Sequence, residues 1–120
     1  MVAAGQPGHS AHELSRAIAV RTEYFATEQA VHSLRQAIKL GHTAEIVAGV
    51  STAITTVDHL ATLAQVRPGD TTSVELRNVV LRCQDALDRA VHQGDIDGVI
   101  GHGELAGDAV MNYAIYLSNP

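Results

Sequence analysis

The stretch LDRAVHQGDIDG, from Leu87 to Gly98, repeats the pattern of the stretch LRQAIKLGHTAEIV, from Leu34 to Val47. In each, apolar residues at three- and four-residue spacing run into a glycine, polar residues follow, and a new apolar stripe begins. This order is typical of a helix, a tight turn and an antiparallel helix. A shift of 53 positions superposes the two stretches. The identical pairs are Leu34/Leu87, Ala37/Ala90, Gly41/Gly94, Ala53/Ala106, Val57/Val110 and Ala61/Ala114.

The repeat predicts two similar helical hairpins, and therefore an all-α antiparallel four-helix bundle. A chain of 120 residues is long enough for one hydrophobic core, so a single domain is expected. Residues 1–9 are expected to form a flexible tail and 10–66 the first hairpin. Residues 67–71, which include Pro68 and Gly69, would be the linker, and 72–118 the second hairpin.

Several residue pairs suggest where the helices begin. Ser10 with Glu13, and Thr72 with Glu75, have the spacing of capping boxes and predict the starts of the first and third helices. Thr43 is expected to cap the second helix. The fourth helix is expected to start between residues 98 and 103, after a turn over 93–98.

Composition excludes some classes of function. The formal net charge is −5 and no basic face is visible, so no nucleic-acid partner is expected. The apolar stretch 46–64 is interrupted by Asp58 and His59, and residues 1–9 do not resemble a signal peptide; no membrane partner is expected. The lone Cys83 suggests a reducing compartment. With arginines outnumbering lysines seven to one, these features favour a bacterial, cytoplasmic protein.

The second turn contains a candidate calcium loop. Gln93, Asp95, Asp97 and Glu104 fall on positions 1, 3, 5 and 12 of an EF-hand loop, with Gly98 at position 6. Calcium prefers oxygen ligands and a sharp turn, which these residues would supply. Gln93 replaces the usual aspartate, however, and the matching turn of the first hairpin has no such ligands. The alternative interpretation is that the acidic residues cap a helix start, in which case no cofactor is bound.

Other catalytic and metal signals are weak. Glu28 with His32, Asp88 with His92, and His9 with Glu13 have the spacing of surface contacts. No Glu-x-x-His motif of a di-iron bundle occurs. Cys83 falls on an expected core face, where a thiol is unreactive. An enzyme is therefore the less favoured interpretation. It would need a site formed between subunits, for which the polar cluster is His59, Asp58 and Arg21.

The first helix is expected to be the longest, about 30 residues against roughly 22 for the others. Its start would then project beyond the bundle and expose an apolar patch, which a second copy can cover. The candidate interface residues are Leu14, Ala17, Ile18 and Val20. The alternative is a break near Arg21-Thr22 that folds the first segment back.

The favoured function is a non-enzymatic interaction or regulatory module acting through a homodimer or a protein partner. A bundle that responds to a small molecule or a metal is the alternative.

Overall fold

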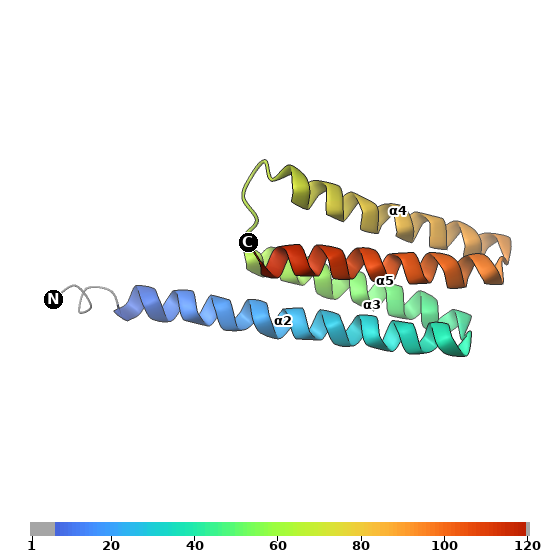
Figure 1. The fold of residues 1–120 in the computed structure, drawn as a ribbon, viewed down its shortest axis with the longest axis horizontal. Helices are drawn as coiled ribbons and strands as arrows, with labels where there is room; N and C mark the ends of the chain where they lie inside the picture. The colour runs from blue at the N-terminus through green and yellow to red at the C-terminus, as the bar shows by residue number, and fades with distance from the viewer. Residues whose placement is uncertain (1–6, 120) are drawn as a thin grey trace.

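The protein folds into four antiparallel α-helices (Figure 1). The computed structural model describes residues 7–119, with side chains from residue 11 onward. Helix α2 runs over Pro7–Leu40 and α3 over Thr43–Ala64; α4 covers Thr71–Gln93 and α5 covers Ile96–Ser118. Within the described residues there is no β-strand. The predicted fold class, an antiparallel four-helix bundle of two hairpins, is confirmed.

The two hairpins pack with α5 at the centre of the bundle. Helix α5 contacts each of the other three helices, and α2, α3 and α5 pack against one another. Helix α4 packs on α5, touches α3 only slightly and, across residues 7–119, makes no contact with α2. Figure 1 shows α5 lying between α4 and α2. One side of α4 is consequently left partly uncovered, and Val91, on the apolar stripe that runs into Gly94, is 44% exposed.

The two hairpin turns have the same backbone hydrogen bonds. Gly41 and Gly94 both adopt a left-handed conformation, with φ of 68° and 67°. The N–H of His42 donates to the carbonyl of Ala37 at 3.1 Å, and the N–H of Asp95 donates to that of Ala90 at 2.9 Å. These bonds satisfy carbonyl groups at the helix end that would otherwise lack partners. The glycine spacing in the sequence therefore identified both turns.

Leu34 lies at the centre of the core, between two glycines. It is fully buried, and a Cβ added at Gly49 or Gly107 would lie 3.2 or 3.3 Å from its methyl groups. A Cβ on Gly103 would lie 2.6 Å from a methyl of Ile46. The small residues of α5 thus let α2 and α3 approach closely within the same chain, and this face is not open to a partner. The other fully or nearly fully buried side chains include Val31, Val50, Val57, Leu60, Val80, Leu87 and Val110.

Helix starts differ from the predicted ones in all four cases. Helix α2 already includes residues 7–9 of the expected tail, because proline is well suited to the first turn of a helix; residues 1–6 lie outside the described part. Helix α3 starts after His42, which makes no side-chain capping bond. Asp70 caps α4 in place of Thr72, and Asp95 caps α5, which begins at Ile96. Aspartate is among the best N-cap residues, so it outcompetes the threonine and glycine that follow.

Helix α2 is continuous through Arg21-Thr22, which rules out the broken-helix alternative. It has 34 residues against 22 in α3 and 23 in α5. At 1.5 Å per residue the excess over α3 is roughly 18 Å, or about three turns. Figure 1 shows this part of α2 extending past the ends of α3 and α5. We call residues 7–20 the overhang.

Candidate functional site

The overhang presents large apolar side chains to solvent. Leu14 is 62% exposed and Ile18 57% exposed, and Phe25, one turn inside the bundle, is 51% exposed. Arg21 is placed over the Phe25 ring, with its guanidinium carbon 5.9 Å from the ring centroid. Three large apolar residues on one helix face form a surface typical of interaction sites.

These exposed residues lie on a different face of α2 from the core residues. At roughly 100° per residue, Leu14, Ile18 and Phe25 fall within about 40° of one another, roughly 150° from the stripe of Val31 and Leu34. Of the predicted interface residues, Leu14 and Ile18 lie on this outer face. Ala17 is exposed at its flank, whereas Val20 is half-buried against the core.

Phe25 was absent from the predicted interface, although the sequence contained a signal for it. It lies seven residues after Ile18 and eleven after Leu14, spacings that return to the same helix face. The prediction followed the core stripe toward the start of the helix. It therefore missed a second stripe that begins on the overhang and continues beside the bundle.

An open groove runs along the flank of α2 where the other helices end. Its volume is about 670 Å³, and its walls include Ala17, Val20 and Tyr24 of α2 with Ala64 and Leu117 from the ends of α3 and α5. Burial and the nearby carboxylate of Glu28 raise the pKa of Tyr24, so its hydroxyl stays protonated near neutral pH. Charged residues, among them Arg16 and Glu28, also line the groove, so it places a mixed apolar and polar depression beside the outer face of α2.

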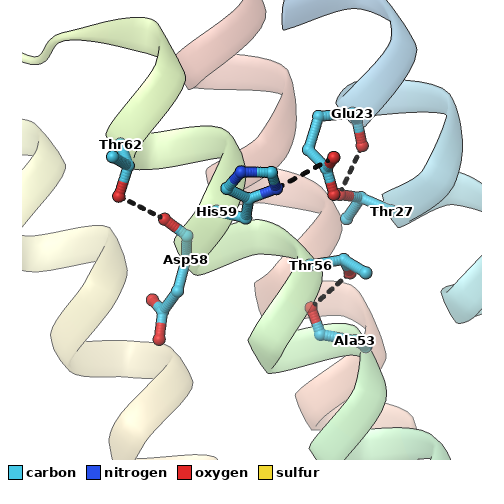
Figure 2. A network of polar contacts seen from close by, with 7 residues as sticks. All are labelled: Glu23, Thr27, Ala53, Thr56, Asp58, His59 and Thr62. Carbon is cyan, nitrogen blue, oxygen red and sulfur yellow. Dashed lines mark hydrogen bonds and ion pairs between the residues drawn. The ribbon is translucent and has the colours of Figure 1, made fainter. Parts of the chain in front are cut away.

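The polar residues predicted for a shared active site point to different partners. His59 Nδ1 lies 3.0 Å from a carboxylate oxygen of Glu23 on α2, whereas Asp58 lies 3.7 Å from Arg77 Nε on α4. Figure 2 shows the two side chains leaving α3 in different directions. Arg21 stacks on Phe25 instead of joining them. The contacts of His59 and Asp58 tie α3 to α2 and α4, and the three residues are not brought together within one chain.

Thr27, near the Glu23 contact, is a buried polar residue on the core face of α2. Its hydroxyl donates to the backbone carbonyl of Glu23 at 2.9 Å (Figure 2). The bond keeps this hydroxyl satisfied in an otherwise apolar stripe. Thr27 is thus a structural residue.

The residues of the candidate calcium loop belong to two helix ends. Gln93 is the last residue of α4, and Asp97 lies in the first turn of α5. Asp95 accepts a hydrogen bond from the N–H of Gly98 at 2.9 Å, and Glu104 lies further along α5. The turn between the helices contains only Gly94 and Asp95. The structure therefore does not arrange these residues as a twelve-residue loop.

The two histidine pairs whose side chains are described, Glu28 with His32 and Asp88 with His92, are not arranged as metal sites. His92 Nδ1 lies 2.9 Å from the backbone oxygen of Asp88. His32 lines a shallow surface depression together with Glu28 and Arg35. Over the described part of the chain, no three His, Cys, Asp or Glu side chains are grouped so that they could hold a metal ion. The side chain of His9 lies outside the described side chains.

A hydrogen bond joins the start of α4 to the end of α5. The hydroxyl of Tyr116 donates to the carboxylate of Asp70 at 2.7 Å, and the other oxygen of that carboxylate accepts from the N–H of Ser73 at 3.1 Å. These two bonds, with the Tyr116 bond the larger cause, lower the pKa of Asp70. The same contact raises the pKa of Tyr116. Asp70 thus caps α4 and anchors it to α5.

Cys83 is half-buried on α4, and this partial burial raises the pKa of its thiol. A thiol with a raised pKa is a poor nucleophile at neutral pH. Burial outweighs the charge of Arg82, which acts to lower this pKa, so Cys83 does not have the lowered thiol pKa of a catalytic cysteine.

Helix α3 is the one helix of the described chain with the length and apolar composition to cross a membrane. Its apolar residues have a role in the bundle: Ile46, Val50, Val57 and Leu60 are buried in the core. A core helix satisfies the same criteria of length and composition.

No protein-family model, curated protein or solved structure matched the chain.

Proposed function

We propose that this protein is a non-enzymatic helical interaction module that self-associates through the overhang of α2. The observation that carries the proposal is the exposure of Leu14 and Ile18 on a continuous helix that projects beyond its own bundle. Phe25 extends the same face. A monomer would leave this stripe in water, whereas a second copy would bury it against an identical stripe.

The polar residues support an interaction module over an enzyme. Among the described residues, His59 is paired with Glu23 and Asp58 with Arg77, so neither is held ready for a substrate. Cys83 has a raised pKa. The most developed surface features are therefore apolar.

The expected association is weak and depends on concentration. Burying one exposed Leu, Ile or Phe side chain contributes about 1.5–3 kcal/mol. Three such residues in each of two copies, each a little over half exposed, would contribute on the order of 5–10 kcal/mol. Association itself costs about 4–15 kcal/mol in lost freedom of motion. Because this gain and this cost are of similar size, the remaining contacts of the helix face must supply the net free energy of association. Dissociation constants in the micromolar to millimolar range are therefore expected.

Light scattering over a range of protein concentrations tests the proposal. The unmodified protein should shift from monomer to dimer mass as its concentration approaches about 1 mM. The double variant Leu14→Glu, Ile18→Glu should stay monomeric, because it places charges on the apolar face. Leu105→Glu is the matched control, since Leu105 is 55% exposed but lies on α5.

The control should dimerise like the unmodified protein, and all three proteins should have the same helical circular dichroism spectrum. An unmodified protein that remains monomeric at about 1 mM would contradict the proposal. A double variant that dimerises normally would show that another surface is used.

A further inference from the structure

The outer face of α2 has the spacing of a short coiled-coil seam. Five exposed residues follow one another at alternating steps of three and four, and we call them the seam: Ala11, Leu14, Ile18, Arg21 and Phe25. A three-four alternation keeps side chains on one line along a helix and is the pattern by which two helices pack. The next residues on this line, Glu28 and His32, are polar, so the seam ends at Phe25.

We infer that two copies of the chain meet antiparallel along this seam, with Ile18 at the two-fold axis. The inference rests on the proposed self-association and adds the direction, the register and the contribution of Phe25. Ile18 is the middle of the seam, seven residues from Ala11 and seven from Phe25. An antiparallel two-fold pairing therefore superposes the two ends and the middle of the seam, while Leu14 falls opposite Thr22 of the second copy, one residue from Arg21.

Charge favours the antiparallel direction. In a parallel pair in register, Arg21 would face Arg21 of the second copy inside the seam, and two like charges would be brought together without a counter-ion. In the antiparallel pair, Arg21 lies opposite Ser15 of the second copy, one residue from Leu14. Its aliphatic stem can cover the leucine while the guanidinium stays over Phe25, the position it already occupies.

Side-chain size agrees with this register. Antiparallel pairing centred on Ile18 places Phe25 opposite Ala11 of the second copy at both ends of the seam. A large residue then faces a small one, which fills the space evenly. A parallel pair would instead place two phenylalanines together at one end and two alanines at the other, leaving the alanine end poorly packed.

Disulfide formation between introduced cysteines tests the direction and the register. Each variant also carries Cys83→Ser, so that the new thiol is the only one in the chain. A disulfide requires Cβ atoms about 3.5–4.5 Å apart, so it reports which positions meet across the interface. Mild oxidation should link Ile18→Cys to itself. A mixture of Ala11→Cys and Phe25→Cys proteins should form mainly the mixed disulfide, and this mixture keeps Leu14 and Ile18 intact.

Phe25→Cys alone should link at least tenfold less than the mixture. Leu105→Cys, on α5, should not link. Efficient linking of Phe25→Cys to itself would overturn the inference and indicate a parallel pair. If light scattering shows a dimer but neither Ile18→Cys nor the mixture links, the register is wrong while self-association stands. If the unmodified protein is monomeric, both proposals fail.

Discussion

At the scale of single residues, the bundle depends on a few close approaches around Leu34. Its methyl groups fill the space that side chains on Gly49 and Gly107 would need. Leu87, its counterpart in the second hairpin, is likewise buried, at 1% exposure. The two leucines are an identical pair of the sequence repeat, and each lies two helical turns before a glycine that ends its helix.

Replacing Leu34 or Leu87 with alanine should therefore be strongly destabilising. Each change removes buried methyl groups and leaves a cavity, with an expected loss of about 2–5 kcal/mol in the free energy of unfolding. Urea denaturation followed by circular dichroism measures it. The control is Leu40→Ala, at an exposed site on α2, where a change within about 0.5 kcal/mol is expected. Losses below about 0.5 kcal/mol at both buried sites would contradict the packing described.

At the scale of helices, the position of α4 depends on its cap. Asp70 binds Ser73 at the start of α4 and Tyr116 near the end of α5. The ionised carboxylate accepts both bonds, so the pKa of Asp70 in the folded protein lies below its unfolded value. The contribution to stability is fully present above the unfolded pKa, near 3.9, and is lost as pH falls through the lower folded pKa.

Tyr116→Phe should raise the pKa of Asp70 toward its ordinary value, because the variant removes the larger cause of the lowering. The free energy of unfolding should then depend less on pH between about pH 4 and pH 2. Titration of the Asp70 carboxyl carbon by NMR gives the pKa directly. The control is Ser118→Ala, which removes an exposed hydrogen bond elsewhere on α5. Tyr113→Phe is unsuitable as a control because Tyr113 is buried. An Asp70 pKa that is the same in Tyr116→Phe and in the unmodified protein would show that the Tyr116 hydrogen bond does not lower it.

The turn between α4 and α5 gives a second prediction at this scale. Asp95 is an N-cap, so Asp95→Ala should lower the free energy of unfolding by about 1 kcal/mol. Millimolar calcium should leave the melting temperature unchanged, both in the unmodified protein and in Glu104→Gln. A bound ion at 100 times its dissociation constant would add about 2.7 kcal/mol, which a thermal scan detects readily. A clear rise with calcium that Glu104→Gln abolishes would restore the loop interpretation.

Much of the fold was predictable from residues whose effect is local. Gly41 and Gly94 identified the two turns, because few other residues tolerate the left-handed conformation that ends a helix. The helix starts were predicted less well, since several nearby residues can cap and the choice is made by tertiary contacts such as that between Asp70 and Tyr116. The partial exposure of Val91 was not predictable either, because periodicity identifies an apolar face but not how fully its neighbours cover it.

The candidate site was predictable only in part. The length of the first helix and the exposure of Leu14 and Ile18 followed from apolar spacing. The sequence did not show that Val20 lies off the exposed face and that Phe25 lies on it. Both facts depend on which side of α2 meets α3 and α5. The partners of His59 and Asp58 also depend on packing, which brings Glu23 and Arg77 to them from other helices.

At the scale of the whole molecule, the chain is a compact bundle with one helix that is too long for it. Figure 1 shows that the longest axis of the molecule follows α2 and its overhang. Residues 11–18 of the overhang are exposed, and a helix segment with so few packing contacts opens readily, because isolated helices of this length are marginal in water. The overhang should therefore become well ordered only when a second copy covers it.

Amide hydrogen exchange on the overhang, followed by NMR at low and high protein concentration, tests this claim most directly. At a concentration well below the dissociation constant found by light scattering, where the dimer is largely dissociated, the amides of residues 11–20 should exchange quickly while those of 27–38 exchange slowly. At about 1 mM, residues 11–20 should exchange at least several-fold more slowly, and this gain should disappear in Leu14→Glu, Ile18→Glu. Exchange rates for residues 11–20 that are the same at both concentrations would contradict self-association through the overhang.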